Sequence, residues 1–207
     1  MFCFWNIISK KMIKTICVFC GSSMGNNGVY RHKAEDFGRM LVKNNISLVY
    51  GGSNIGLMHA LADTVLDAGG KVTGVMPGHL ADKGLVHQHL TEMHIVGSMH
   101  ERKALMAELS DGFVAFPGGF GTLDEVFEIL SWIQLAIIEK PCAFFNIAGY
   151  YDHLLTFLDH CVSENFIRQE HHHNLIVEND ENLLLRKMLD FTPLHVDKWI
   201  DRLREMG

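Results

Sequence analysis

A chain of 207 residues is long enough for one compact domain, and its 48% of hydrophobic residues excludes an intrinsically disordered protein. The formal net charge of −6 argues against nucleic acid as the main partner, because a phosphate backbone requires a cationic protein surface. We therefore expect no nucleic-acid partner, while a local basic site for one small anion stays compatible with this charge.

Short β-branched runs alternate with longer helical patterns along the chain, which predicts a parallel sheet covered by helices. The expected strands span residues 14–20, 46–50, 71–76, 93–96, 112–116, 142–145 and 175–177. The expected helices span residues 29–44, 55–68, 99–109, 122–138, 150–165 and 181–190. The strands are continuous apolar runs, which is typical of strands buried on both faces. The predicted fold class is therefore α/β, with a Rossmann-like, doubly wound parallel sheet in a single domain.

The first residues stand outside this pattern. Residues 1–8 are apolar and precede Lys10 and Lys11, which reverses the charge order of a signal peptide. No run approaches the roughly 18 apolar residues that span a bilayer, so we expect no membrane partner. We expect residues 1–12 to form a disordered extension and residues 13–207 to form the folded domain.

The five cysteines contain no zinc-spaced set, and their odd number suits a reducing cytoplasm, which is the expected location. Cys17 and Cys20 have the spacing of a redox motif, but both lie in an apolar run that ends a predicted strand. Free cysteines are often buried, so the favoured interpretation is two structural thiols.

Three expected strands end in glycine-rich turns, at residues 20–23, 50–54 and 117–122. In a parallel sheet such turns lie at the ligand-binding edge, and a following helix start attracts anions. A single glycine-rich turn is explained equally well by the tight strand-to-helix loop that any parallel α/β protein needs. Three such turns at one edge favour an anionic ligand. None has the dinucleotide glycine pattern or a Walker lysine, which disfavours a dinucleotide or nucleoside triphosphate.

The expected helix at 99–109 begins with several charged residues. Ser98 and Glu101 have capping-box spacing, which accounts for Glu101 by itself. Arg102 and Lys103 oppose the helix dipole, and two interpretations stay open for them. They either meet an anion at the helix start or form a solvated charged face.

Thr122 and Glu125 also have capping-box spacing, so Glu125 either closes the helix start or points at a ligand held by the glycine turn. Asp124 and Glu125 are adjacent and diverge by about 100° on a helix. They do not face one reacting carbon together, which disfavours a two-carboxylate glycosidase of the usual type.

The presence of 13 histidines suggests a metal site, but their spacing does not support one. Adjacent residues of the run His171, His172 and His173 point apart, so we expect a solvated loop there. His79, His87, His89 and His94 show no recognisable ligand spacing. We therefore expect neither a metal nor a cofactor.

Residues 117–125, Pro-Gly-Gly-Phe-Gly-Thr-Leu-Asp-Glu, resemble the PGGxGTxxE signature of the Lonely guy (LOG) family. Residues 99–103 resemble its second signature, residues 16–23 its opening strand and turn, and residues 50–58 its second turn. Ser53 and His59 depart from the family, which usually or often has glycine there; this bears on fine substrate preference. The resemblance extends over about residues 13–190.

The resemblance implies a cytokinin riboside 5′-monophosphate phosphoribohydrolase, in which water cleaves the N-glycosidic bond to give an adenine-type base and ribose 5-phosphate. It implies that Arg102 and Glu125 are catalytic. The expected substrate-binding residues are Ser22, Lys103, Gly118, Gly119, Gly121, Thr122 and Ser131. It also implies a homodimer or an assembly of dimers. The apolar helical segment 126–138 fits burial against both the sheet and a partner, or a wholly internal core helix.

Three other functions are weighed against this one. Decarboxylation with pyridoxal phosphate needs a Schiff-base lysine and a cofactor cradle, and the chain is short for such an enzyme. A general nucleosidase for AMP or another purine monophosphate stays open, because the pattern of residues does not distinguish plain from modified adenine. A non-catalytic module that senses a nucleotide stays open as well.

Overall fold

The structure, a computed structural model, describes residues 12–194. Residues 1–11 and 195–207 lie outside the described residues. The expectation of an N-terminal extension falls almost entirely on the former and stays a prediction.

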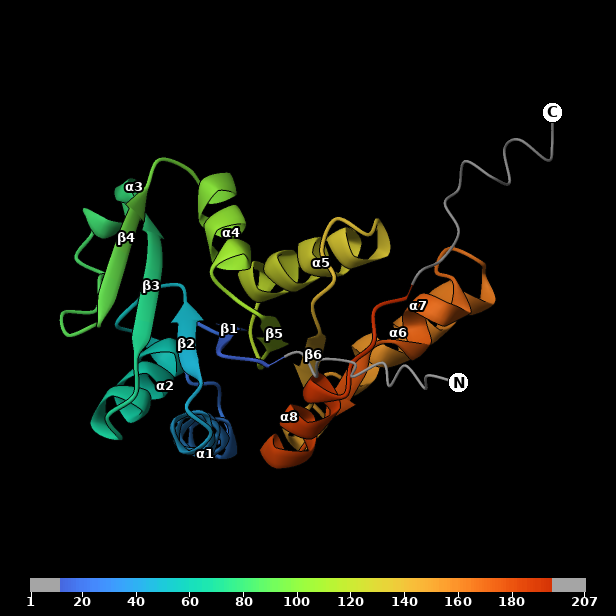
Figure 1. The fold of residues 1–207 in the computed structure, drawn as a ribbon, viewed down its shortest axis with the longest axis horizontal. Coiled ribbons are helices and arrows are strands. Elements are labelled where there is room, and N and C mark those ends of the chain that lie inside the picture. Colours follow the sequence, from blue (N-terminus) through green and yellow to red (C-terminus); the bar gives the residue numbers. More distant parts are fainter. Residues whose placement is uncertain (1–11, 195–207) are drawn as a thin grey trace, which may run out of the picture.

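Seven parallel strands of the described chain form one sheet in the order β4-β3-β2-β1-β5-β6-β7 (Figure 1). They are β1 (Thr15–Phe19), β2 (Ser47–Tyr50), β3 (Val72–Pro77), β4 (Glu92–Val96), β5 (Gly112–Ala115), β6 (Cys142–Phe145) and β7 (Ile176–Glu178). The chain runs outward from β1 to one edge and then returns to continue beside β1 at β5. This reversal is the position at which doubly wound sheets bind ligands. The predicted α/β class and all seven strands are confirmed.

The helices pack on both faces of the sheet. They are α1 (Val29–Lys43), α2 (Gly56–Asp67), α3 (Gly78–Ala81), α4 (Met99–Glu108), α5 (Phe120–Gln134), η1 (Ile147–Gly149), α6 (Asp152–Ser163), α7 (Gln169–His173) and α8 (Glu181–Leu189). Helices α1, α2 and α8 cover one face, and α4, α5 and α6 cover the other (Figure 1). Within residues 12–194, no helix has the length and apolar character needed to cross a bilayer.

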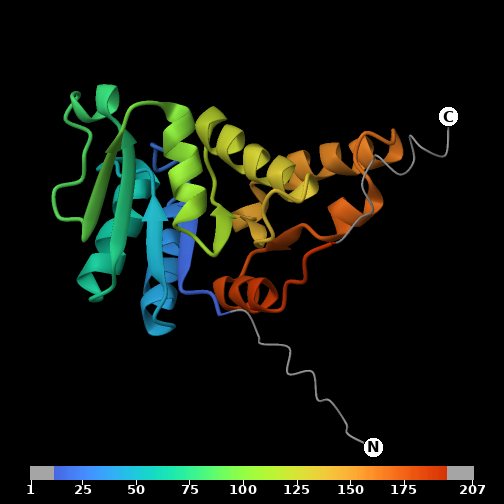
Figure 2. The ribbon, with the colours of Figure 1, turned by 45° about the horizontal axis from the view of Figure 1, so that its top comes forward.

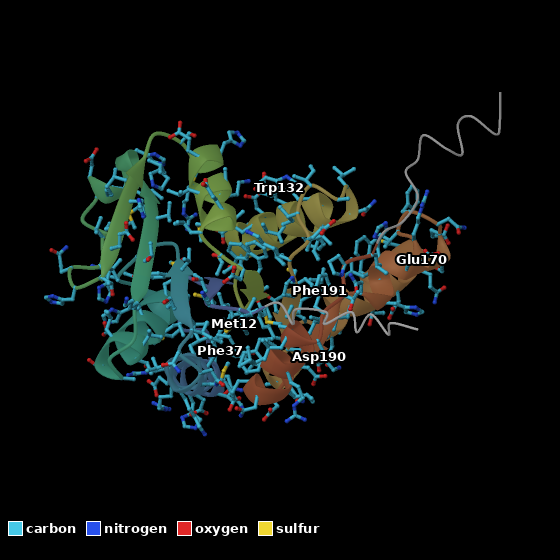
Figure 3. All side chains as sticks on the ribbon, in the orientation of Figure 1. Met12, Phe37, Trp132, Glu170, Asp190 and Phe191 are labelled. Atoms are coloured by element: carbon cyan, nitrogen blue, oxygen red, sulfur yellow. The ribbon has the colours of Figure 1, made fainter. Side chains whose placement is uncertain are left out.

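Strand β1 shows why the core strands are continuous apolar runs. Ile16 and Val18 pack into the core on one face of the sheet, and Cys17 and Phe19 pack into the core on the other. On the α1 side, the ring of Phe37 is fully buried and packs against the sheet (Figure 3). Two-sided burial of the central strands is therefore confirmed.

Cys17 and Cys20 are buried free thiols. Burial raises the pKa of both thiols, so neither is a reactive thiolate at neutral pH. The structural interpretation of this pair is confirmed.

Helix α5 differs from its predicted bounds, residues 122–138. It begins at Phe120, with Gly119 at the N-cap position, and ends at Gln134. Ala136 follows with a φ of 53°, a left-handed conformation that stops the helix. The interpretation of a wholly internal helix is wrong for the single chain, since Ser131 and Gln134 are exposed.

The expectation of a solvated loop at the histidine run is wrong. Gln169–His173 forms α7, and His171 and His172 are partly buried. His172 Nε2 lies 3.1 Å from Asp159 Oδ1 on α6. A helix of five residues is too short to show periodicity, so only its contact with α6 reveals it.

Candidate active site

The three glycine-rich turns meet at one edge of the sheet because β2, β1 and β5 are neighbours. The backbone N–H of Gly21 donates to the carbonyl of Pro117 at 3.0 Å, which joins the first turn to the third. The backbone N–H of Leu57, at the start of α2, donates to the carbonyl of Gly21 at 3.1 Å. The predicted convergence of the turns is confirmed.

A cavity of about 370 Å³ opens at this edge. Its volume lies in the range of small-molecule sites, roughly 300–1,000 Å³. Its polar and glycine lining comprises Gly21, Ser22, Gly51, Ser53, Arg102, Gly119, Gly121, Thr122 and Glu125. Its apolar lining includes Ile55, Met58, Met76, Leu80 and Leu85. The cavity thus has a charged, glycine-rich part and an apolar part.

Arg102 on α4 and Glu125 on α5 form an ion pair in this cavity, where the two helices lie side by side (Figure 2). Arg102 Nη1 lies 2.8 Å from Glu125 Oε1, and Arg102 Nε donates to the carbonyl of Val75 at 3.0 Å. The two side chains are 12% and 8% exposed. Two fixed hydrogen bonds therefore hold the guanidinium, and the guanidinium holds the carboxylate.

The second glycine turn makes room for this pair. A Cβ atom at Gly51 would overlap Arg102 Nη2. The absent side chain lets the guanidinium lie directly against the turn. One of the glycines noted in the sequence therefore serves the packing of Arg102.

Burial raises the pKa of the Glu125 carboxyl above its ordinary value. The positive charge of Arg102 opposes this rise, and the nearby Asp124 adds to it. Glu125 is thus a carboxylate that takes up a proton at higher pH than an exposed glutamate does.

The interpretation of Glu125 as a helix cap is wrong. Helix α5 begins two residues before Thr122 and has no side-chain cap, and the Glu125 side chain turns to Arg102 instead. Thr122 is buried within the first turn, where a Cβ atom at Gly118 would overlap its hydroxyl. The spacing was that of a capping box, but the glycine turn moves the helix start.

The Ser98 cap of α4 is confirmed, whereas the return bond of Glu101 goes to Gly97, one residue before the cap. The Ser98 hydroxyl accepts from the backbone N–H of Glu101 at 3.1 Å, and the Glu101 carboxylate accepts from the backbone N–H of Gly97 at 2.8 Å. Glu101 therefore has a structural partner of its own.

Lys103 does not line the cavity. Its ammonium lies 3.1 Å from both Asp124 Oδ2 and Glu128 Oε2 on α5. Burial lowers its pKa, but the hydrogen bonds and charges of Glu128 and Asp124 outweigh this and raise it. With side chains 12% and 11% exposed, Arg102 and Lys103 do not form a solvated face, so that interpretation is wrong.

The structure brings most of the predicted substrate-binding residues together, because Ser22, Gly119, Gly121 and Thr122 line the cavity. Gly118 lies behind them and accepts a hydrogen bond from the Tyr150 hydroxyl at 2.6 Å. Ser131 lies three turns along α5, where its hydroxyl donates to the carbonyl of Phe127. It lines a separate cavity of about 220 Å³, between α5 and the segment after α8.

Two features of the site were missed in the sequence. One is the apolar lining, which comes from α2, β3, α3 and the segment after α3. The other is a pair of tyrosines after β6: Tyr151 is buried and donates to the carbonyl of Phe116, while Tyr150 braces Gly118. Adjacent tyrosines at the start of the expected helix 150–165 were the available signal for this second feature.

Comparisons with known proteins identify the family. A family profile described as possible lysine decarboxylase matches residues 58–188. The probable cytokinin riboside 5′-monophosphate phosphoribohydrolase LOGL9 of Oryza sativa subsp. japonica is 44% identical over 187 residues, which cover 90% of this chain and 82% of the relative. Arabidopsis thaliana LOG1, named cytokinin riboside 5′-monophosphate phosphoribohydrolase, is 43% identical over 90% of this chain and 87% of its own. The chain belongs to the LOG family.

Solved structures show the same fold at lower identity. The molybdenum cofactor carrier protein from Chlamydomonas reinhardtii aligns with a TM-score of 0.62 and 20% identity, covering 87% of this chain and 100% of that one. The molybdenum cofactor binding protein from Rippkaea orientalis aligns with a TM-score of 0.62 and 20% identity, covering 86% and 98%. At this identity the likeness concerns the LOG-type fold alone.

The two LOG signatures form one structural unit. Residues 117–125 make the third glycine turn and the first turn of α5, and residues 99–103 begin α4. Each signature supplies one member of the buried Arg102–Glu125 pair. The resemblance inferred from these motifs is confirmed.

Proposed function

We propose that this protein hydrolyses the N-glycosidic bond of a cytokinin-type nucleoside 5′-monophosphate, releasing an adenine-type base and ribose 5-phosphate. The names of its relatives support this reaction. The observation that carries the proposal is the buried Arg102–Glu125 pair, 2.8 Å between Nη1 and Oε1, in a cavity surrounded by three glycine-rich turns.

The substrate phosphate binds at the start of α5, beside Gly119, Gly121 and Thr122, which all line the cavity. The first backbone N–H groups of a helix have no intrahelical partners and carry a partial positive charge. Binding of the phosphate there holds the ribose so that its C1′ carbon faces Glu125. This positioning lowers the barrier of the chemical step.

Glu125 acts on the glycosidic carbon. As the bond from C1′ to the base nitrogen breaks, positive charge develops on the ribose, and a buried carboxylate stabilises that charge electrostatically. A water oxygen forms the new bond to C1′ and Glu125 accepts one water proton, which it then releases to solvent. The departing base takes up one proton at nitrogen from solvent, so the net reaction consumes one water molecule. Two Arg102 donors are bound to Glu125 and to the Val75 carbonyl, so Arg102 orients the carboxylate and favours its charged form.

The base occupies the apolar part of the cavity. Met58, Met76, Leu80 and Leu85 offer hydrocarbon and thioether surface and no charge. Such a lining favours an adenine with an apolar substituent over plain AMP, because burial of apolar surface contributes about 25 cal/mol per Å².

The protein acts as a homodimer in the cytoplasm, in this proposal. The Phe120 side chain is 94% exposed at the mouth of the cavity, and Leu135 and Ile137 are exposed just beyond α5. Exposed apolar side chains at both ends of α5 favour a protein partner along this helix. Buried free thiols at Cys17 and Cys142 suit a reducing compartment.

Incubation of the purified protein with isopentenyladenosine 5′-monophosphate and with AMP tests the proposal, with free base measured by chromatography. We expect both free base and ribose 5-phosphate from the modified nucleotide, at a higher kcat/KM than from AMP. Faster cleavage of AMP would favour the general nucleosidase. Binding of both nucleotides without cleavage would favour the sensor.

A further inference from the structure

Two histidines and an aspartate cluster outside the residues that line the proposed active site. His59 and Asp63 lie four residues apart on α2, which places both side chains on one face of that helix. His87 comes from the segment between α3 and β4 and is buried. We propose that His59, Asp63 and His87 bind a divalent transition-metal ion of the zinc class.

The geometry is close to that of a three-ligand metal site. Asp63 Oδ2 lies 3.1 Å from His59 Nε2, and Asp63 Oδ1 lies 2.7 Å from His87 Nε2. One ligand atom from each of the three residues lies within 4.8 Å of the others. Ligands at about 2.0–2.2 Å from a tetrahedral zinc ion are separated by about 3.4 Å, so small side-chain rotations bring these atoms to one ion.

The exposure of the side chains leaves room for a coordinated water. His59 and Asp63 are about half exposed, at 45% and 43%, whereas His87 is 4% exposed. The inner side of the site is thus closed by protein, and the fourth position opens toward solvent. Two imidazoles and a carboxylate form a ligand set that suits zinc, cobalt and nickel better than magnesium or calcium.

Binding of the ion requires a change of tautomer at His87. Its Nδ1 accepts from the backbone N–H of His89 at 3.3 Å, so the neutral ring carries its proton on Nε2 and donates to Asp63. Ligation through Nε2 moves the proton to Nδ1 and breaks this long contact with His89. His59 Nδ1 is buried and makes no hydrogen bond within the described residues, and the His59 ring lies against the His87 ring with their centroids 5.6 Å apart.

The ion would fasten one wall of the active-site cavity. The segment that carries His87 is joined to the second glycine turn, since His87 N–H donates to Gly52 and Asn54 N–H donates to Leu85. Leu85 lines the apolar part of the cavity. An ion on His59, Asp63 and His87 would tie this segment to α2, which makes its role structural, because none of its three ligands lines the cavity.

Cobalt binding to the full-length protein tests this site directly. After treatment with EDTA and its removal, the protein is titrated with Co²⁺ and followed by visible absorption, and with Zn²⁺ and followed by Tm. We expect one equivalent of Co²⁺ to give the absorption bands of a four- or five-coordinate ion, Zn²⁺ to displace it, and Zn²⁺ to raise Tm. Affinity should fall as the pH falls, because the imidazoles must be neutral to bind.

The chain has 13 histidines, so variants are needed to show that the Co²⁺ absorption comes from an ion at His59, Asp63 and His87. His59→Gln and Asp63→Asn should each weaken Co²⁺ binding at least tenfold, because each variant removes one of the three ligands, and loss of a group that only supports a ligand already costs about 10- to 100-fold. His172→Gln is the matched control, because His172 also pairs with an aspartate, Asp159, but belongs to no three-ligand group within residues 12–194. Both His59 and Asp63 are half exposed, so their variants should fold.

No Co²⁺ uptake, or uptake that His59→Gln and Asp63→Asn leave unchanged, would overturn the proposal. Loss of uptake in His172→Gln would overturn it as well, since the ion would then sit at other histidines. These outcomes are independent of the proposed hydrolysis, whose failure would appear in the assay of free base.

Discussion

Two ion pairs between α4 and α5 start from adjacent residues and have different surroundings. Arg102 pairs with Glu125 inside the cavity, and both side chains are nearly buried. Lys103 pairs with Asp124 and Glu128, and Asp124 is 59% exposed. Adjacent residues on a helix diverge by about 100°, so one step along the chain separates a buried charge pair from an outer one. Position on the helix, and not charge alone, therefore decides which of the two cations pairs with the buried Glu125.

The largest effect is expected from Glu125→Gln, which keeps the shape of the side chain and removes its charge. Turnover should fall by at least about 100-fold, because the developing charge on the ribose and the attacking water lose the carboxylate. Nucleotide binding, measured by calorimetry, should stay within a few fold, since the phosphate is held at the start of α5. Unchanged turnover would remove Glu125 from the mechanism.

Arg102→Ala should have the next largest effect, and it should lower both turnover and the free energy of unfolding. The variant leaves the Glu125 carboxylate buried without its partner, which costs about 3–5 kcal/mol for a buried pair. Removal of the positive charge should raise the pKa of Glu125 further. A carboxyl with a raised pKa favours folding at low pH and loses that contribution as the pH rises through the folded-state value.

Urea unfolding of Arg102→Ala and of wild type at pH 5 and pH 8 therefore tests how this loss of stability changes with pH. The variant should lose more free energy of unfolding, relative to wild type, at pH 8 than at pH 5. Equal losses at the two values would show that Glu125 is not the group left unpaired.

Lys103→Met should have the smallest effect and sharpens the contrast between the two pairs. Asp124 and Glu128 are 59% and 26% exposed, so water can replace Lys103 as their partner and the free energy of unfolding should fall by only about 0–1 kcal/mol. Turnover should stay within about twofold, because the Lys103 ammonium faces Asp124 and Glu128. A loss of nucleotide affinity of tenfold or more would return Lys103 to the substrate-binding role that the family resemblance implies.

The sheet could be predicted from the sequence because its signal is local and strong. Each strand is a short apolar run between turn residues, and burial on both faces keeps that run continuous, as in β1. The meeting of the three glycine turns followed from parallel topology alone. Arg102 and Glu125 were found because two short signatures carry them.

What the sequence did not show depends on contacts between distant residues. The start of α5 was misplaced because Thr122 and Glu125 have capping spacing, while the Gly119 backbone begins the helix. The partners of the Lys103 ammonium depend on which carboxylates of α5 lie next to α4 in the folded chain. His87 approaches His59 and Asp63 only because a loop folds back onto α2.

The pH dependence of kcat/KM of the wild-type enzyme tests the central claim most directly, that Glu125 works as a buried, ionised carboxylate. With isopentenyladenosine 5′-monophosphate as substrate, kcat/KM should rise with pH along an acid limb whose midpoint lies above the ordinary glutamate value of about 4.3. Burial of Glu125, which raises its pKa, is the cause of that displacement. An acid limb at or below the ordinary value, or a rate that rises as the pH falls, would contradict the account.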